Sequence, residues 1–307
     1  MKILLDCDPG HDDAVALLLA LASPEVDLVG VTTVHGNQTL EKTTVNALKL
    51  LEFAGRAEIP VAAGAGRPIR REPFVAEYVH GESGMDGPAL PAPTTAPVGE
   101  HAVDFIARTV LESDEPVTLV PTGPLTNIGL FLARHPEAAS SVDRIVLMGG
   151  AIGEGNVTPA AEFNIWVDPE AADRVFSSGL DVTMVGLDVT HRAIFGPEPT
   201  ERLKRAGRVG AMVAELLEFY GRFHREYYGW DGSPIHDAVA MAHAFRPGIL
   251  ETVRTGVRVD CGEELGRGRT NVDLRGRVGW APNAHVAVEI DAEAFIELLV
   301  ERLSSLG

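Results

Sequence analysis

Short apolar runs alternate with helical patterns along most of this chain. The apolar runs have the length of buried strands and lie at residues 2–5, 28–34, 117–120, 144–148, 182–187 and 285–290. The helical patterns lie at residues 13–21, 39–54, 101–111, 125–133, 169–177, 237–244 and 292–303. Strands that alternate with helices predict a mostly parallel sheet with helices on both faces. We therefore expect an α/β fold of the Rossmann-like type, with an open, mixed central sheet.

Two segments interrupt the alternation. Residues 64–100 are rich in proline and glycine, and a stretch of this length without its own pattern is typical of an active-site loop. Residues 261–282 are rich in arginine and glycine and indicate a hairpin or a surface loop. We expect a second site loop at about residues 219–235. No low-complexity linker divides the chain, so residues 1–307 are predicted to form a single domain.

The composition limits the partners that this protein can have. A net charge of -18 argues against nucleic acid as a partner, and no stretch long enough to span a bilayer is free of charge. The two cysteines are too few for a disulfide framework, and the first strand begins without a signal-like segment. We expect a cytoplasmic protein that binds a small molecule and does not bind a membrane.

Four aspartates, Asp6, Asp8, Asp12 and Asp13, lie within eight residues at the end of the first predicted strand. Two negative charges ~5 Å apart repel by roughly 3 kcal/mol at an effective dielectric of about 20. Because no lysine or arginine follows nearby, a hard divalent cation, Ca²⁺ or Mg²⁺, is the expected counter-charge. Ordinary capping of a helix explains Asp12 or Asp13 but leaves Asp8 unexplained, since Asp8 ends a strand that should be buried.

Polar residues follow the other predicted strands as well, and ligands of such sheets bind beyond the carboxyl ends of the strands. Farther along the chain, His236 and Asp237 begin a helical pattern, where they indicate either an N-cap or a metal ligand beside a proton donor. Glu162 and Asn164 flank Phe163 after a glycine-rich loop, and we expect them to point the same way from an extended segment. Such a pair suits the vicinal hydroxyls of a sugar, although an edge strand would look similar.

Aromatic residues crowd a helical pattern that leads to His236. Phe219 and Phe223 have the spacing of core residues, whereas Tyr227, Tyr228 and Trp230 lie near a turn where they could stack on a flat ring. The other histidines show no zinc spacing and are interpreted as structural, with His11 a spacer in the aspartate loop. The glycines match neither a dinucleotide fingerprint nor a P-loop, so we do not expect a phosphate cradle.

Several of these motifs, taken together, resemble the nucleoside hydrolases of the inosine-uridine preferring type. The segments that carry the resemblance are residues 6–14 (DCDPGHDDA), 32–39 (TTVHGNQT), 120–127 (VPTGPLTN), 161–164 (AEFN), 168–171 (DPEA), 236–237 (HD) and 269–273 (RTNVD). They run almost from end to end of the chain. The resemblance implies Ca²⁺-dependent hydrolysis of the bond between ribose and a nucleobase, and it implies a homodimer or homotetramer.

The resemblance also implies roles for particular residues. The metal ligands would be Asp8, Asp13, the main-chain oxygen of Thr122, and Asp237, with a water and two ribose hydroxyls completing the shell. Asp8 would also be the general base, and His236 the acid that protonates the leaving base. The remaining substrate contacts would come from Asp12, Asn37, His80, Met148, Asn156, Glu162, Phe163, Asn164 and Tyr227. His80 is a second candidate for the acid.

Two other functions remain open at this point. An apolar strand followed by Asp6 and Asp8 also begins haloacid dehalogenase-type phosphatases, although Pro9 and Gly10 stand where that motif continues differently. A non-catalytic nucleoside or ribose sensor would use the same ligands without turnover. The preference for a purine or a pyrimidine cannot be assigned from these residues.

Overall fold

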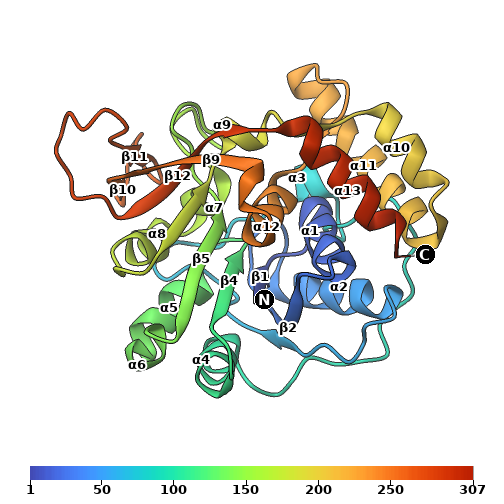
Figure 1. Cartoon of the computed structure of the whole chain (residues 1–307), viewed down its shortest axis with the longest axis horizontal. Helices are drawn as coiled ribbons and strands as arrows, with labels where there is room; N and C mark the ends of the chain where they lie inside the picture. The colour runs from blue at the N-terminus through green and yellow to red at the C-terminus, as the bar shows by residue number, and fades with distance from the viewer. Residues whose placement is uncertain (307) are drawn as a thin grey trace.

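The computed structural model describes residues 1–306, so that only Gly307 of the predicted domain lies outside the described residues. Within them the chain folds around an eight-stranded sheet in which every neighbouring pair is parallel except the last (Figure 1). In spatial order the strands are β3 (Val61–Ala63), β2 (Asp27–Thr33), β1 (Lys2–Cys7), β4 (Val117–Pro121), β5 (Val142–Met148), β6 (Val182–Val185), β12 (Ala284–Ile290) and β9 (Leu250–Thr255). The predicted mixed α/β sheet is confirmed.

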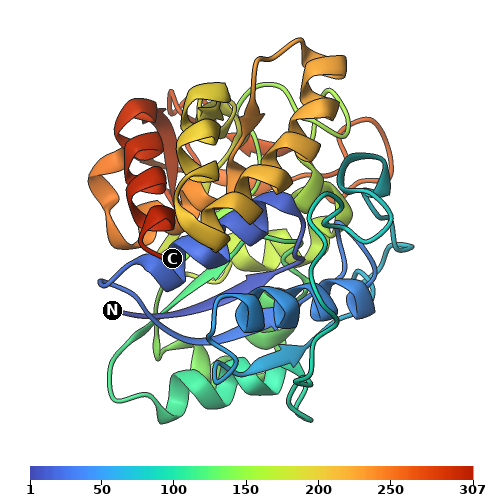
Figure 2. The ribbon, with the colours of Figure 1, turned by 90° about the vertical axis from the view of Figure 1, so that its right-hand side faces the viewer.

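Helices cover both faces of this sheet. The helices on one side are α1 (His11–Ala22), α2 (Leu40–Phe53), α9 (Leu187–Thr190), α12 (His236–Phe245) and α13 (Ala292–Ser304), with α10 (Pro197–Lys204) and α11 (Gly207–Tyr228) packed on them. Those on the other side are α4 (Ala102–Glu112), α5 (Thr126–Arg134), α6 (Pro136–Ala139), α7 (Phe163–Val167) and α8 (Pro169–Phe176). Figure 2 shows the red α13 and the yellow-orange α10 and α11 on one side of the strands, with the teal-green α4 on the other.

The two helical layers exist because each strand is apolar on both faces. In β1 the side chains of Ile3 and Leu5 enter one core, and that of Leu4 enters the other. A parallel sheet requires this double burial, which explains why its strands appear as continuous apolar runs in the sequence.

Smaller elements complete the chain. They are α3 (Glu77–His80), the 3-10 turn η1 (Pro247–Ile249), the pair β7 (Ile194–Phe195) with β8 (Ser233–Pro234), and the hairpin pair β10 (Val257–Val259) with β11 (Thr270–Val272). Among residues 1–306 no helix has the length and apolar character needed to cross a membrane.

The structure corrects three expectations about elements. The strand expected at residues 182–187 ends at Val185, because Leu187 already begins α9. The site loop expected at about residues 219–235 is helical as far as Tyr228, the end of α11. Strands β3 and β9 were not expected. β3 spans only three residues, and β9 carries a polar, half-exposed pattern that gives little apolar signal.

Candidate active site

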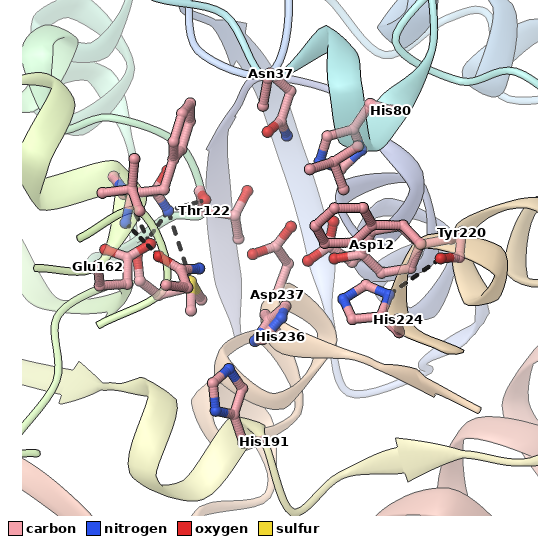
Figure 3. Close-up of a pocket in the computed structure, with 18 of the residues that line it drawn as sticks. Asp12, Asn37, His80, Thr122, Glu162, His191, Tyr220, His224, His236 and Asp237 are labelled. Carbon is pink, nitrogen blue, oxygen red and sulfur yellow. Dashed lines mark hydrogen bonds between the residues drawn. The ribbon is translucent and has the colours of Figure 1, made fainter. Parts of the chain in front are cut away.

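A cavity lies at the carboxyl edge of the sheet, where the loops after several strands meet the first turns of α1 and α12 (Figure 3). Eleven of the residues predicted from sequence line it: Asp12, Asn37, His80, Thr122, Met148, Asn156, Glu162, Phe163, Asn164, His236 and Asp237. Segments that are far apart in the sequence therefore meet at this edge of the sheet, as expected for this fold class.

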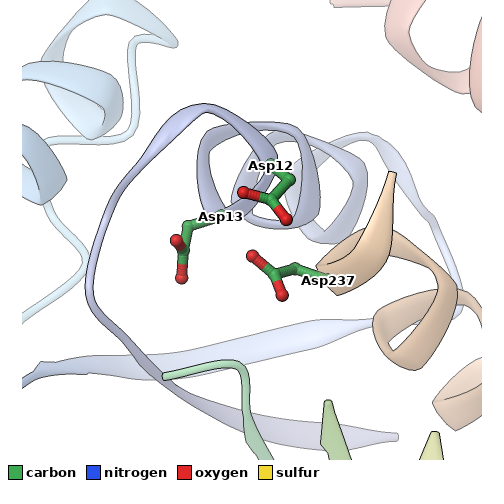
Figure 4. Close-up of side chains that lie close together, drawn as sticks. All are labelled: Asp12, Asp13 and Asp237. Carbon is green, nitrogen blue, oxygen red and sulfur yellow. The ribbon is translucent and has the colours of Figure 1, made fainter. Parts of the chain in front are cut away.

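Three carboxylates converge where the first turns of two helices meet (Figure 4). Asp12 and Asp13 lie in the first turn of α1, and Asp237 lies in the first turn of α12. Each can offer one oxygen such that these oxygens all lie within 4.8 Å of one another, and all three side chains are buried. The N-terminal ends of the helix dipoles favour negative charge here, but by a modest amount. Asp237 is not the N-cap of α12, because Ile235 occupies that position.

Asp8 is completely buried next to this cluster. Its Oδ2 accepts a hydrogen bond of 2.6 Å from the backbone N–H of Asn37, whereas its Oδ1 has no hydrogen-bond partner among the described residues. Glycines flank the carboxylate, and a Cβ added at Gly36 or Gly123 would lie 2.0 Å or 2.5 Å from its oxygens. The backbone thus closes around Asp8 while one of its oxygens stays unpaired.

Asp13, in contrast, is held by four hydrogen bonds. The backbone N–H groups of Asp8 and Gly10 donate to it at 3.2 Å and 3.0 Å. The amide of Asn37 donates at 2.9 Å, and the hydroxyl of Thr122 donates at 2.9 Å. This network fixes the Asp13 carboxylate relative to Asp8 and to the loop after β4.

Burial and mutual repulsion disfavour the charged form of these carboxylates. Burial first, and the neighbouring aspartates second, raise the pKa of Asp12 to about 8 and raise the pKa values of Asp8 and Asp237 well above the ordinary range. The pKa of Asp13 is also raised by burial, although its hydrogen bonds oppose the shift.

The cluster has the properties of a cation site. Among residues 1–306, those that line the cavity include no lysine and no arginine. No lysine or arginine side chain there neutralises the carboxylates. The unpaired Oδ1 of Asp8 and the carboxylates of Asp12, Asp13 and Asp237 form an all-oxygen donor set, which hard divalent cations prefer. The residues present therefore fit a bound Ca²⁺ or Mg²⁺.

On the opposite wall, Glu162 and Asn164 form a rigid polar group. Glu162 caps α7 by accepting hydrogen bonds from the N–H groups of Asn164 and Ile165, and it also accepts one from Gly150. Burial raises the pKa of Glu162 to about 7. The amide of Asn164 donates to the main-chain oxygen of Thr122 at 2.7 Å. The expected extended segment is thus wrong, because α7 begins at Phe163, yet both polar residues line the cavity.

Three imidazoles line the remaining wall. Nδ1 of His236 lies 2.8 Å from the hydroxyl of the buried Thr190. The ring of His191 meets that of His236 at a centroid distance of 5.5 Å, and His224 lies farther along the wall on α11 (Figure 3). The interpretation of His191 as structural is wrong, since it lines the cavity. Its place next to His236 depends on the turn after β6, which carries no local sequence signal.

Three further residues lie elsewhere than the sequence suggested. Tyr227 is 70% exposed and stacks on Phe223 outside the cavity, because the turn of α11 directs Tyr220, Phe223, His224 and Tyr228 inward instead. Asp6 takes no part in the cluster, since Thr32 and Asn127 donate hydrogen bonds to it on the other side of β1. His11 is not a spacer but is fully buried against His80.

Comparisons with known proteins agree with this site. The family model described as inosine-uridine preferring nucleoside hydrolase matches residues 3–297. The chain is 52% identical over 305 residues to the pyrimidine-specific ribonucleoside hydrolase RihA of Escherichia coli O8 (strain IAI1), covering 99% of this chain and 98% of the relative.

Solved structures of the same kind superimpose on the chain. A plant nucleoside hydrolase, PpNRh1, has a TM-score of 0.94 at 37% identity and covers 99% of this chain and 98% of its own. The purine-preferring ribonucleoside hydrolase from Gardnerella vaginalis has a TM-score of 0.94 at 34% identity, covering 100% of this chain and 99% of its own. The fold, the acidic cavity and these likenesses define an N-glycosyl hydrolase of the ribonucleoside class. The chain belongs to the inosine-uridine preferring nucleoside hydrolase family, which confirms the resemblance found in its sequence.

Proposed function

We propose that this enzyme hydrolyses the N-glycosidic bond of pyrimidine ribonucleosides, such as uridine, with Ca²⁺ as its cofactor. The observation that carries the proposal is the convergence of Asp12, Asp13 and Asp237 beside the unpaired Oδ1 of Asp8. Support for a pyrimidine comes from the 52% identity to a relative named as pyrimidine-specific. Neither the phosphatase nor the sensor hypothesis is favoured by the family to which the chain belongs.

The cation would be held by Asp8, Asp13, Asp237 and the main-chain oxygen of Thr122. The hydroxyl of Thr122 donates a hydrogen bond to Asp13, and the main-chain oxygen of Thr122 accepts one from the amide of Asn164. When bound, the cation would acidify a water and orient the ribose hydroxyls.

The chain's own residues then supply the chemistry around the sugar. Breaking a glycosidic bond develops positive charge on the ribose, and the buried carboxylates of Asp12 and Glu162 stabilise such charge once ionised. Asp8, whose Oδ1 has no hydrogen-bond partner among the described residues, would take the proton of the attacking water. Asn37, Met148, Asn156, Phe163 and Asn164 would orient the substrate from the surrounding wall.

The leaving base requires a proton or a strong hydrogen bond. The hydroxyl of Thr190, which has no other side-chain hydrogen bond within residues 1–306, can donate to Nδ1 of His236. The imidazole proton then resides on Nε2, where it can serve the base. We therefore assign His236 as the residue that donates a hydrogen bond from Nε2 to the leaving base, and Thr190 as the residue that sets its tautomer.

A panel of nucleosides assayed for free ribose tests the proposal directly. Uridine and cytidine should be cleaved faster than inosine and adenosine, activity should disappear after treatment with a chelator, and added Ca²⁺ should restore it. Release of phosphate from p-nitrophenyl phosphate, or tight binding of nucleosides without release of ribose, would contradict the proposal.

The surroundings of this function also remain proposals. We expect the enzyme to act in the cytoplasm in nucleoside catabolism and base salvage, as a homodimer or homotetramer that binds neither nucleic acid nor membranes. Light scattering of the purified protein measures the oligomeric state, and a single-chain mass of 32.7 kDa would contradict the expected assembly.

A further inference from the structure

We propose that His11 is a positioning residue that holds His80 as a hydrogen-bond donor toward the nucleobase. This inference rests on the proposed function, because it concerns the leaving group of the same reaction. His11 itself lies outside the cavity wall and is fully buried, whereas His80 lines the cavity. Figure 3 shows His80 and His236 on opposite sides of the Asp12 and Asp237 carboxylates.

The contacts of His80 determine which of its nitrogens carries the proton. The backbone N–H of His11 donates to Nδ1 of His80 at 3.3 Å. A backbone amide can only donate, so Nδ1 of His80 is an acceptor and a neutral ring carries its proton on Nε2. Nε2 makes no hydrogen bond to any of residues 1–306, which leaves it available to a ligand in the cavity. Burial lowers the pKa of His80 well below its ordinary value, in agreement with a neutral ring.

The ring of His11 lies against His80 on one side and is anchored to Asp86 on the other. Its Nδ1 lies 3.1 Å from Nδ1 of His80, and its Nε2 lies 2.8 Å from the main-chain oxygen of Asp86. The main-chain oxygen of Asp86 can only accept, so the single N–H of the neutral His11 ring is on Nε2, and the unprotonated Nδ1 of His11 lies against His80 without donating to it. The ring also stacks with its neighbours, at centroid distances of 5.2 Å from Phe219, 5.3 Å from His80 and 5.4 Å from Tyr220.

His80 needs such support because the segment around it has little structure of its own. Helix α3 has only four residues, and Gly81 and Gly84 after it have φ values of 80° and 86°. Gln38 and Asn46 anchor this segment by donating to the carbonyls of Glu82 and Ser83. These anchors do not touch the His80 ring, whereas His11 does, and His11 also ties the far end of the segment to α1.

The expected ligand group is an acceptor atom on the leaving base. The O2 carbonyl of a pyrimidine is such an acceptor, and it gains electron density as the glycosidic bond breaks. A donor held in place before the reaction strengthens its hydrogen bond at that moment without reorganising. The loss of His11 would therefore slow the hydrolysis of a substrate more strongly when its leaving group depends on that hydrogen bond.

The test compares uridine with p-nitrophenyl riboside, whose leaving group needs no proton. His11→Phe keeps an aromatic ring in the stack but removes both ring nitrogens, and we expect it to lower kcat on uridine by about 10- to 100-fold while changing turnover of p-nitrophenyl riboside by less than about threefold. Phe219→Leu is the matched control, because it disturbs the stack without removing a hydrogen bond, and it should leave the ratio between the two substrates unchanged.

A double-mutant cycle shows whether His11 acts through His80. His80→Phe should itself lower kcat on uridine, and the variant carrying both substitutions should be no slower than His80→Phe alone. Equal losses on both substrates in His11→Phe, or losses that multiply in the double variant, would assign His11 a purely structural role and overturn the proposal. A wild-type enzyme that releases no ribose from any nucleoside would instead reject the proposed function.

A measurement on the wild-type protein keeps the proposal testable if His11→Phe does not fold. In ¹⁵N-labelled protein, the imidazole signals that vanish in His80→Phe belong to His80. We expect them to show a protonated Nε2 and an unprotonated Nδ1. A proton on Nδ1 instead would overturn the proposal.

Discussion

At the scale of single residues, four aspartates of one short segment have four different surroundings. Asp6 accepts from Thr32 and Asn127 through Oδ1, away from the cavity, and leaves its Oδ2 unpaired, whereas the unpaired oxygen of Asp8 lies next to the cluster. Asp12 lines the cavity, and Asp13 is saturated with hydrogen bonds. The chemistry of each carboxylate is therefore set by its neighbours, and Asp8 alone combines complete burial with a free oxygen next to the cluster.

Replacing Asp8 with Asn should reduce the release of ribose from uridine by about a thousandfold, since it removes both a metal ligand and the proposed base. Asp6→Asn makes the same chemical change at an equally buried site outside the cavity. The rate per folded molecule should stay within about threefold in this control. Circular dichroism checks that both variants fold, and undiminished turnover by Asp8→Asn would reject the assigned role.

Replacing His236 with Ala should slow uridine far more than p-nitrophenyl riboside, by about a hundredfold against a few-fold. Thr190→Val removes the hydroxyl that faces Nδ1 of His236 while keeping the side-chain volume, so it should show the same substrate pattern more weakly. Steady-state kinetics with both substrates measures the ratio. Similar losses on the two substrates would count against a role of His236 at the leaving base.

At the scale of elements, helix ends build this site. The first turns of α1 and α12 present the cluster, and the last turns of α11 present Tyr220, His224 and Tyr228 to the cavity. On a helix, residues four positions apart lie on one face, so the neighbour of an inward residue points elsewhere. Tyr220, His224 and Tyr228 follow one another at this spacing and line the cavity, whereas Tyr227 follows Phe223, stacks on it and is 70% exposed.

Tyr228→Ala should raise KM for uridine by roughly three- to tenfold, because it removes an aromatic contact worth about 1 kcal/mol. Tyr227→Ala is the matched control on the exposed side of the same helix and should leave KM unchanged. Initial rates over a range of uridine concentrations measure both values. The opposite order of effects would restore Tyr227 as the residue that closes on the base.

Local pattern predicted most elements here, because the strands are apolar on both faces and the helices have clear periodicity. It also predicted the residues that end strands or begin helices, such as Asn37 and Asp237, since chain order alone brings those positions to one edge. It did not predict His191 or the burial of His11. Both depend on packing between segments distant in sequence, α9 with α12 and α1 with α3, which no local spacing encodes.

At the scale of the whole molecule, an acidic protein carries its most closely packed negative groups inside. The formal net charge is -18, and none of the cavity-lining residues within 1–306 is a lysine or arginine. The stability of the fold should therefore respond to both metal and pH more strongly than surface charge alone would produce.

The metal-free protein should lose stability as the pH rises from about 7 to about 8.5. The pKa of Asp12 is raised to about 8 and that of Glu162 to about 7, so the folded protein holds protons there that the unfolded chain has released. Their stabilising contribution is complete below about pH 4 and disappears as the pH passes these values. Below about pH 6.5 the buried histidines, whose pKa values are lowered, act in the opposite direction, since there the unfolded chain binds the extra protons.

Bound Ca²⁺ should remove this loss of stability at high pH. At one hundred times its Kd, a ligand that binds only the folded state adds about 2.7 kcal/mol, which corresponds to a rise in Tm of roughly 4 °C for a chain of this size. Differential scanning calorimetry at pH 6.5 and 8.5, with chelator or with Ca²⁺, measures the effect. A Ca²⁺-induced shift that is absent, or no larger at pH 8.5, would contradict the carboxylate site.

The contact between α1 and α12 also has a consequence during synthesis of the protein. Asp237 lies 224 residues after Asp13 in the chain, so the ribosome makes the turn that carries Asp12 and Asp13 long before Asp237 appears. Until then, no nascent or prematurely terminated product can assemble the pocket, so incomplete chains should be unable to degrade the nucleosides of the cell.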